Sequence, residues 1–180
     1  MNRPRVLGAI ALVFYALHAT ELLLARPPQV LLWSCDVAAL AVPVGLLSGS
    51  TLLTSAGCLM LITGLPLWII DVSCGGDFWP ASPLIHVGTP ILALLAMRRL
   101  GLPGRSWLLA IALTGAVTLA SRFAGAPEQN VNLAFTVPRG FEATSPPHAV
   151  YLALVGGAFA VVTLASHLAL RRLGFALPDK

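Results

Sequence analysis

The chain has 180 residues, of which 57% are hydrophobic and only 10% are charged, and its mean hydropathy is +0.86. Because about a quarter of the residues in soluble globular domains are charged, this composition excludes an ordinary soluble domain and indicates a polytopic membrane protein. The net charge of +4 comes from short basic clusters, and no run of lysine and arginine with interleaved aromatic residues indicates a nucleic-acid partner.

Six apolar runs have about the length that a helix needs to cross a hydrocarbon core of about 30 Å. They cover residues 6–25, 30–47, 51–70, 82–97, 106–121 and 149–170. Helices are predicted because the runs lack the alternating polarity of barrel strands and because a helix satisfies its own backbone hydrogen bonds in lipid. We therefore predict an all-α bundle of six transmembrane helices, which forms a single integral membrane domain over residues 1–180.

Lysine and arginine residues are unequally distributed between the two sides of this predicted bundle. One side carries eight of them, namely Arg3, Arg5, Arg98, Arg99, Arg105, Arg171, Arg172 and Lys180, and the other carries Arg26, Arg122 and Arg139. Since short cytoplasmic loops are enriched in positive charge, both termini are predicted to be cytoplasmic. The first run contains His18 and Glu21 and no small-residue cleavage site, so we expect a retained helix. These features favour a bacterial inner membrane.

Ionisable residues within the apolar runs gather toward the outer side. His18 and Glu21 are three residues apart and therefore share one helical face. The other residues at similar depth are Cys35, Asp36, Asp71, His86, His148 and Tyr151. Such groups are costly in a membrane, so they normally face the bundle interior and mark function. We predict that they line a polar pocket that faces the periplasm or the exterior.

Two further features bear on this pocket. Pro90 follows His86 by four residues, so its ring conflicts with the His86 carbonyl and predicts a kink beside the histidine. The outer connection over residues 122–148 contains four prolines and the polar group EQNVN at 128–132. Loops longer than about 12–15 residues are usually functional or disordered, and we predict that this one covers the pocket.

The residue types leave several chemistries open. The sequence contains no HExxH, CxxC, G-x-S-x-G or P-loop motif. A nucleophilic site requires a thiol or hydroxyl, such as Cys35 or Ser34, beside a histidine base such as His86. Asp36 or Asp71 is a candidate for the carboxylate that fixes the tautomer of that histidine. Zinc held by histidines and carboxylates is a minority alternative without supporting spacing, so no metal or other cofactor is predicted.

Three local patterns carry a resemblance to a known family. They are LLWSCDVAAL, PLIHVGTPILALL and NVNLAFTVPRGFEATSPPHAVY, and they follow one another within residues 31–151. They resemble bacterial YwaF-type integral membrane proteins, which look like distant relatives of androgen-induced intramembrane lipid hydrolases and phospholipid acyltransferases. The resemblance covers roughly residues 30–155 and implies a six-helix bundle, with Cys35 as the nucleophile and His86 as its partner. Asn130 and Asn132 match the polar motif before the last helix.

The leading expectation for function is acyl transfer or hydrolysis on a membrane lipid. Cys35 is then the nucleophile and His86 the base, and Asp36 or Asp71 orients the histidine. The expected substrate-binding residues are His18, Glu21, Asn130, Asn132, His148 and Tyr151. The two asparagines are expected to donate hydrogen bonds to a developing oxyanion or to a head group.

A non-catalytic bundle is the alternative from a different functional class. It binds a small molecule or a partner protein through the same outer pocket. A transporter is disfavoured because the ionisable residues do not continue to the cytoplasmic side. The two halves of the chain also show no inverted repeat.

Overall fold

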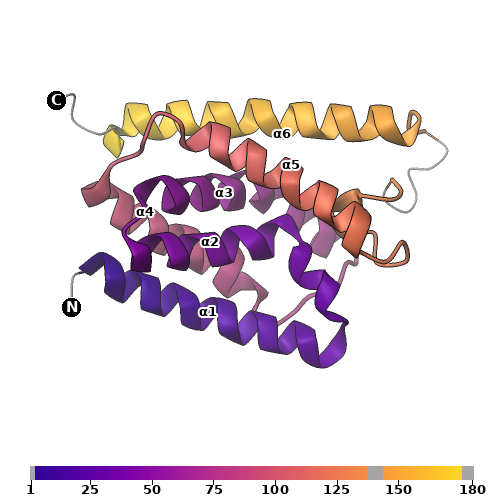
Figure 1. The fold of residues 1–180 in the computed structure, drawn as a ribbon, viewed down its shortest axis with the longest axis horizontal. Helices are drawn as coiled ribbons and strands as arrows, with labels where there is room; N and C mark the ends of the chain where they lie inside the picture. The colour runs from indigo at the N-terminus through magenta and orange to yellow at the C-terminus, as the bar shows by residue number, and fades with distance from the viewer. Residues whose placement is uncertain (1–2, 138–143, 176–180) are drawn as a thin grey trace.

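The structure of the chain is a computed structural model that describes residues 3–137 and 144–175. Within these residues it is all helical and contains no β-strand. The long helices run side by side along the longest axis of the molecule, and α1 begins at the same end at which α6 finishes (Figure 1). The predicted all-α fold is confirmed.

Six α-helices follow the predicted runs closely. They are α1 (Arg3–Ala25), α2 (Ser34–Ser48), α3 (Thr51–Ser73), α4 (Thr89–Leu100), α5 (Ser106–Ala124) and α6 (His148–Leu170). The chain also has two short 3-10 segments. The first, η1 (Pro28–Leu32), precedes α2, and the second, η3 (Val131–Leu133), lies in the connection between α5 and α6. Two π-helical turns, η2 (Leu84–Gly88) and η4 (Arg171–Phe175), lie directly before α4 and after α6.

Four of these helical segments are long and apolar enough to cross a membrane. They are Arg3–Ala25, Thr51–Ser73, Ser106–Ala124 and His148–Phe175. The helices α2 and α4 are shorter, with 15 and 12 residues. Helices of this length and composition are those of an integral membrane protein.

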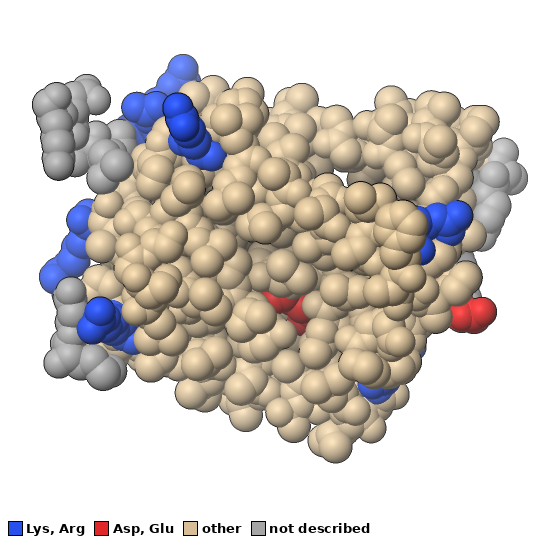
Figure 2. All heavy atoms as spheres, in the orientation of Figure 1, with Lys and Arg blue, Asp and Glu red and all other residues tan. Residues whose placement is uncertain are grey.

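Charged side chains are concentrated at the two ends of the bundle. On the face shown in Figure 2, lysine and arginine gather mainly at the end where α1 begins and α6 finishes, and most of the surface between the ends is uncharged. Arg139 and Lys180, which the orientation prediction counted, lie outside the described residues. The part of the predicted outer connection over residues 138–143 lies outside them as well.

The hairpin of α2 and α3 forms the core of the bundle. Gly49 adopts φ +79° at the turn, a conformation that favours glycine, and the Ser50 hydroxyl accepts a hydrogen bond from the Leu53 N–H to cap α3. A Cβ added at Gly45 would lie 2.6 Å from the backbone nitrogen of Thr54, so only glycine permits this close approach of the two helices. Because α2 lies in this core, polar residues at its start are also buried.

The start of α2 differs from the prediction. The run 30–47 was expected to be one helix, but Trp33 adopts φ −56° and ψ 137° and separates the 3-10 turn η1 from α2. The physical reason is that Pro27 and Pro28 begin the segment as an extended and then 3-10 backbone, since a proline lacks the N–H of a regular helix. Cys35 and Asp36 therefore lie in the first turn of α2, and not five and six residues inside a helix that begins at residue 30.

The conflict predicted between Pro90 and the His86 carbonyl is accommodated by a π-helical turn. The Thr89 N–H donates to the Leu84 carbonyl five residues earlier, which widens the helix over η2 before α4 begins. Single π-helical turns are often found at functional sites, because they shift the side chains of one turn relative to the next. His86 lies at the centre of this turn.

Candidate functional site

A cavity of about 1710 Å³ lies among α1, α2, α3, α5 and α6 and the connections at one end of the bundle. Most of its walls are apolar, and Figure 2 shows acidic atoms in a hollow in the middle of the face, where the surrounding surface is uncharged. The predicted site residues that line the cavity are His18, Cys35, Asp36, Asp71, His86, Asn130, Asn132, His148 and Tyr151. Glu21 does not line it. The structure thus brings all but one of the predicted residues to one cavity.

His18 and Asp36 form a buried pair at this cavity. The Nε2 atom of His18 lies 3.2 Å from Oδ1 of Asp36, and the two side chains are only 4% and 2% exposed. The two atoms are within ion-pair distance without the alignment of a hydrogen bond. Oδ1 of Asp36 therefore has no hydrogen-bond partner among the described residues, and Nδ1, the other ring nitrogen of His18, has none either. Buried polar atoms are usually bonded, so these two call for a partner within the cavity.

The position of Asp36 in α2 stabilises its negative charge. It is the acidic residue in the first turn of the helix. The unpaired N–H groups of a first turn and the helix dipole together favour a carboxylate there. This explains why an aspartate is acceptable in so apolar a stretch.

Cys35 is half-buried beside this carboxylate. Its Sγ atom lies 3.9 Å from Oδ2 of Asp36, and both residues line the cavity. The order of groups is therefore thiol, carboxylate and then the His18 imidazole. In a nucleophilic cysteine site the imidazole lies next to the thiol, because it takes the proton from sulfur. Here a carboxylate next to the thiol disfavours a second negative charge on sulfur.

His86 is held in the π-helical turn by two hydrogen bonds to Ser82. Its Nδ1 atom lies 3.0 Å from the Ser82 carbonyl and 3.1 Å from the Ser82 hydroxyl. Since a carbonyl can only accept, Nδ1 carries a proton, and the neutral ring keeps its lone pair on Nε2. Asp36 and His18 both lie within electrostatic range of this ring. His86 thus offers Nε2 as an acceptor within the same cavity.

Trp68 fixes the plane of the His86 ring. The two rings are stacked, with centroids 4.6 Å apart and an angle of 9° between their planes. Trp68 extends from α3 and itself lines the cavity. The imidazole is therefore held by a stack on one face and by Ser82 at one edge.

Asn132 connects the long connection between α5 and α6 to the start of α2. Its Oδ1 atom accepts from the backbone N–H of Ser34 at 2.8 Å and from the Ser34 hydroxyl at 2.7 Å. Its Nδ2 atom donates to the Leu32 carbonyl and to the Ser121 hydroxyl. The side chain acts as an N-cap for α2 supplied from elsewhere in the chain, which satisfies a first-turn N–H.

Asn130 and His148 shape the same connection locally. The Oδ1 atom of Asn130 accepts from the N–H groups of Phe135 and Thr136 at 3.0 Å each. Nε2 of His148 lies 3.0 Å from the Leu133 carbonyl and donates to it, which ties the start of α6 to the connection. The asparagines do not donate to an open site in this arrangement, because their amide groups already bond to the protein.

The remaining predicted residues lie near the rim. Asp71, at the outer end of α3, is exposed and lines the cavity, and Tyr151 lines it from the first turn of α6. Glu21 accepts a hydrogen bond from the Ala81 N–H at 2.9 Å, so it anchors the connection before η2 to α1. At the rim, Arg26 and Asp77 form an exposed ion pair.

Two residues that line the cavity were not singled out by the sequence, and neither was Tyr15, which lies near the site without lining the cavity. Tyr15 lies within electrostatic range of Asp36, and Ser82 and Trp68 hold His86. Helical spacing was an available signal for two of them, since Tyr15 precedes His18 by three residues and Ser82 precedes His86 by four. Nothing in the sequence pointed to Trp68.

Metal and disulfide chemistry find no support in this geometry. Among the described residues, no three histidine, cysteine or acidic side chains are close enough together to hold a metal ion. All three cysteines are free thiols, with Cys58 buried in α3 and Cys74 exposed. The minority prediction of a zinc site gains nothing from the structure.

Comparison with known proteins adds no relative. No family model matches the chain, and neither the curated proteins nor the solved structures contain a match. The resemblance to YwaF-type proteins stays a prediction based on its three motifs.

Proposed function

We propose that this chain is an integral membrane protein of the bacterial inner membrane, with six spanning helices and both termini in the cytoplasm. Four long apolar helices support the coarser part of this proposal, an integral membrane protein. A continuous helical run over 82–100 joins η2 to α4 and is about 28 Å long at 1.5 Å per residue, which is close to the hydrocarbon thickness. With this orientation the cavity faces the periplasm or the exterior.

The proposed role of the cavity is to bind the polar end of a membrane lipid. The observation that carries this proposal is the convergence of the His18–Asp36 pair and His86 in one large cavity with apolar walls. Ligand sites are typically concave and mostly apolar, with a few fixed polar groups that orient the ligand. A ligand with a polar end and an apolar part complements both the fixed polar groups and the apolar walls of this cavity.

The polar groups present complementary hydrogen-bonding chemistry to such a ligand. Nε2 of His86 and Oδ1 of Asp36 accept hydrogen bonds, and the Tyr151 hydroxyl both donates and accepts. Hydroxyl or amine groups of a lipid head group supply the donors that the two acceptors lack. This role needs no covalent step and agrees with the thiol–carboxylate–imidazole order at Cys35.

Filling the cavity is the cleanest test, because it does not disturb the buried pair. Gly156 in α6 lines the cavity, and a Cβ added there meets nothing within 4 Å. Gly156→Leu is expected to weaken binding of dihexanoyl phosphatidylglycerol, a water-soluble short-chain lipid, at least tenfold. The measurement is a titration of intrinsic fluorescence in detergent, since Trp33, Trp68 and Trp79 all line the cavity.

Gly157→Leu is the matched control. Gly157 is the next residue of the same helix, has open space at its Cβ position and does not line the cavity. Both substitutions raise helix propensity by about 1 kcal/mol, so both variants are expected to fold. Equal affinity for the lipid in wild type and both variants contradicts lipid binding in this cavity.

Acyl transfer is a second candidate function, favoured by the position of Cys35 in the same cavity as His86. In that reaction the Cys35 sulfur attacks an ester carbonyl carbon and gives its proton to Nε2 of His86. A C–S bond forms, the ester C–O bond breaks, and the histidine returns the proton to the departing alcohol oxygen. Water or a second alcohol then releases the acyl group from sulfur.

A thiol-directed lipid electrophile separates the two functions. If Cys35 is a nucleophile, Cys35→Ser and His86→Ala each abolish labelling at residue 35 in folded protein, whereas Cys74→Ser does not. Labelling of Cys35 that continues unchanged in His86→Ala contradicts the catalytic role and leaves binding as the function. The distribution of labelled peptides is read by mass spectrometry.

A further inference from the structure

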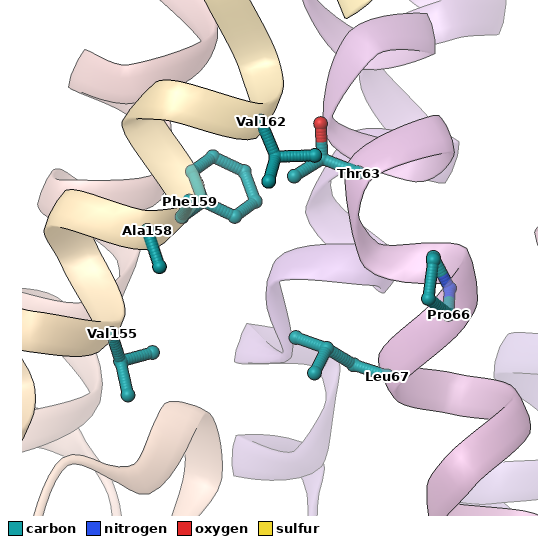
Figure 3. Close-up of a pocket in the computed structure, with 7 residues that line it drawn as sticks. All are labelled: Thr63, Pro66, Leu67, Val155, Ala158, Phe159 and Val162. Atoms are coloured by element: carbon teal, nitrogen blue, oxygen red, sulfur yellow. The ribbon is translucent and has the colours of Figure 1, made fainter. Parts of the chain in front are cut away.

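An apolar groove lies between α3 and α6, at the edge of the bundle. It has a volume of about 280 Å³ and is lined by Thr63, Pro66, Leu67, Val155, Ala158, Phe159 and Val162. In Figure 3 the side chains from α6 point across the gap toward Thr63 and Leu67 on α3. The groove therefore separates two helices that elsewhere in the bundle are in contact.

The groove offers no free hydrogen-bonding group. Thr63 is its one lining residue with a side-chain oxygen, and that hydroxyl lies 3.2 Å from the Thr163 hydroxyl, with which it forms a hydrogen bond. All other lining side chains are hydrocarbon. The surface thus matches a hydrocarbon chain and offers nothing to a polar ligand.

The groove is adjacent to the large cavity. Leu67, Val155 and Phe159 line both of them. The side chains of these three residues therefore form the boundary between a partly polar site and an apolar one.

The packing of α6 leaves this side of the cavity open. Its buried residues are Thr163, His167 and Leu170, all in the C-terminal half of the helix. Residues 148–162, which flank the cavity and the groove, include no buried residue. This half of the helix is more exposed than the C-terminal half, although His148, its first residue, bonds to the connection before it.

The positions of the cavity and the groove along α3 and α6 indicate how a bound lipid is oriented. The cavity extends from the outer ends of α3 and α6, where Asp71 and His148 lie, to the middle of both helices at Met60 and Phe159, and the groove lies beside this deeper part, around Thr63. A lipid of the outer leaflet has its head group and its acyl chains in the same order. The groove thus lies where the chain of such a lipid extends.

We propose that the α3–α6 groove is a lateral entrance that admits one acyl chain of an outer-leaflet lipid while its head group occupies the cavity. This inference rests on the proposed lipid-binding function and adds the route and the chain site. The lipid enters sideways from the bilayer, and not from the aqueous phase.

Ala158 provides the test. It is exposed and lines the groove, so Ala158→Phe places a phenyl ring in the path of the chain. Ala153→Phe is the matched control, because Ala153 is also exposed on α6 and lines neither the groove nor the cavity. The probe is phosphatidylglycerol with a diazirine at the end of one acyl chain, in phosphatidylcholine vesicles that contain the full chain.

Irradiation of wild type and of Ala153→Phe is expected to label peptides that contain residues 63–67 and 155–162. Ala158→Phe is expected to reduce this labelling at least tenfold and to keep the affinity for dihexanoyl phosphatidylglycerol within about threefold of wild type. Equal labelling of the groove in the Ala158→Phe variant overturns the entrance, and so does labelling of wild type that is absent from residues 63–67 and 155–162. If wild type fails to bind dihexanoyl phosphatidylglycerol, the proposed function fails and the entrance fails with it.

Discussion

Replacing Asp36 with alanine is expected to lower the free energy of unfolding by about 3–5 kcal/mol, because the change leaves His18 buried without its partner. The carboxylate is 2% exposed, lies 3.2 Å from the His18 ring and occupies the first turn of α2. The measurement is equilibrium unfolding in mixed detergent micelles, followed by circular dichroism. The double replacement of His18 and Asp36 by alanine is expected to lose less than the sum of the two single variants.

Asp77→Ala is the control for Asp36→Ala. Asp77 also pairs with a basic group, Arg26, but the two side chains are 63% and 46% exposed. Exposed pairs contribute about 0.2–1 kcal/mol, so this variant is expected to remain close to wild type. If Asp36→Ala and Asp77→Ala lower the free energy of unfolding equally, that result contradicts a stabilising role of the buried His18–Asp36 pair.

Asn132→Ala is expected to lower the free energy of unfolding by about 2–4 kcal/mol, since its amide makes four hydrogen bonds that each contribute about 1 kcal/mol. The bonds reach the backbone and hydroxyl of Ser34, the Leu32 carbonyl and the Ser121 hydroxyl. Their loss leaves the first turn of α2 without its cap. Affinity for dihexanoyl phosphatidylglycerol is therefore expected to fall together with stability, because Cys35 and Asp36 lie in that turn.

Two further variants separate the loss of the Asn132 hydrogen bonds from backbone strain and from weakening of the connection as a whole. Asn132 adopts φ +54°, where alanine is strained and glycine is not, so Asn132→Gly is expected to lose less stability than Asn132→Ala. Asn130→Gly removes bonds that remain within the connection itself, at a residue with φ +44°, so it is expected to leave the cap of α2 intact. An Asn132→Ala variant as stable as wild type contradicts the capping role.

Hydropathy was enough to predict where the helices lie. Each apolar run contains an α-helix, since the need to satisfy backbone hydrogen bonds in lipid leaves few other solutions. The break at Trp33 was missed because Val30, Leu31 and Leu32 are as apolar as a spanning helix. The prolines at 27 and 28 were the only local sign of a 3-10 turn before α2.

The depth of each ionisable residue within its predicted helix also predicted most of the candidate site residues. Counting residues from the outer ends brought His18, Asp36 and His86 to one level, and the structure places all three at one cavity. The direction of each side chain was not predictable, because it depends on contacts between residues far apart in the sequence. Asn132 bonds to a residue 98 positions away, and Trp68 approaches His86 from another helix.

The catalytic expectation for Cys35 depended on the same unknown directions. Residue types suggested that His86 would meet the thiol and that a carboxylate would orient the histidine. In the structure Ser82 orients His86, and Asp36 lies between Cys35 and His18. Which side chains lie next to Cys35 and His86 depends on where α2 begins and on the π-helical turn at His86. The composition of the chain specifies neither.

Native mass spectrometry of the purified wild-type chain tests the central claim most directly. The account predicts one phospholipid bound to each chain, displaced by dihexanoyl phosphatidylglycerol and absent from the Gly156→Leu variant. A wild-type chain that carries no lipid and gains none on addition of phosphatidylglycerol would contradict it.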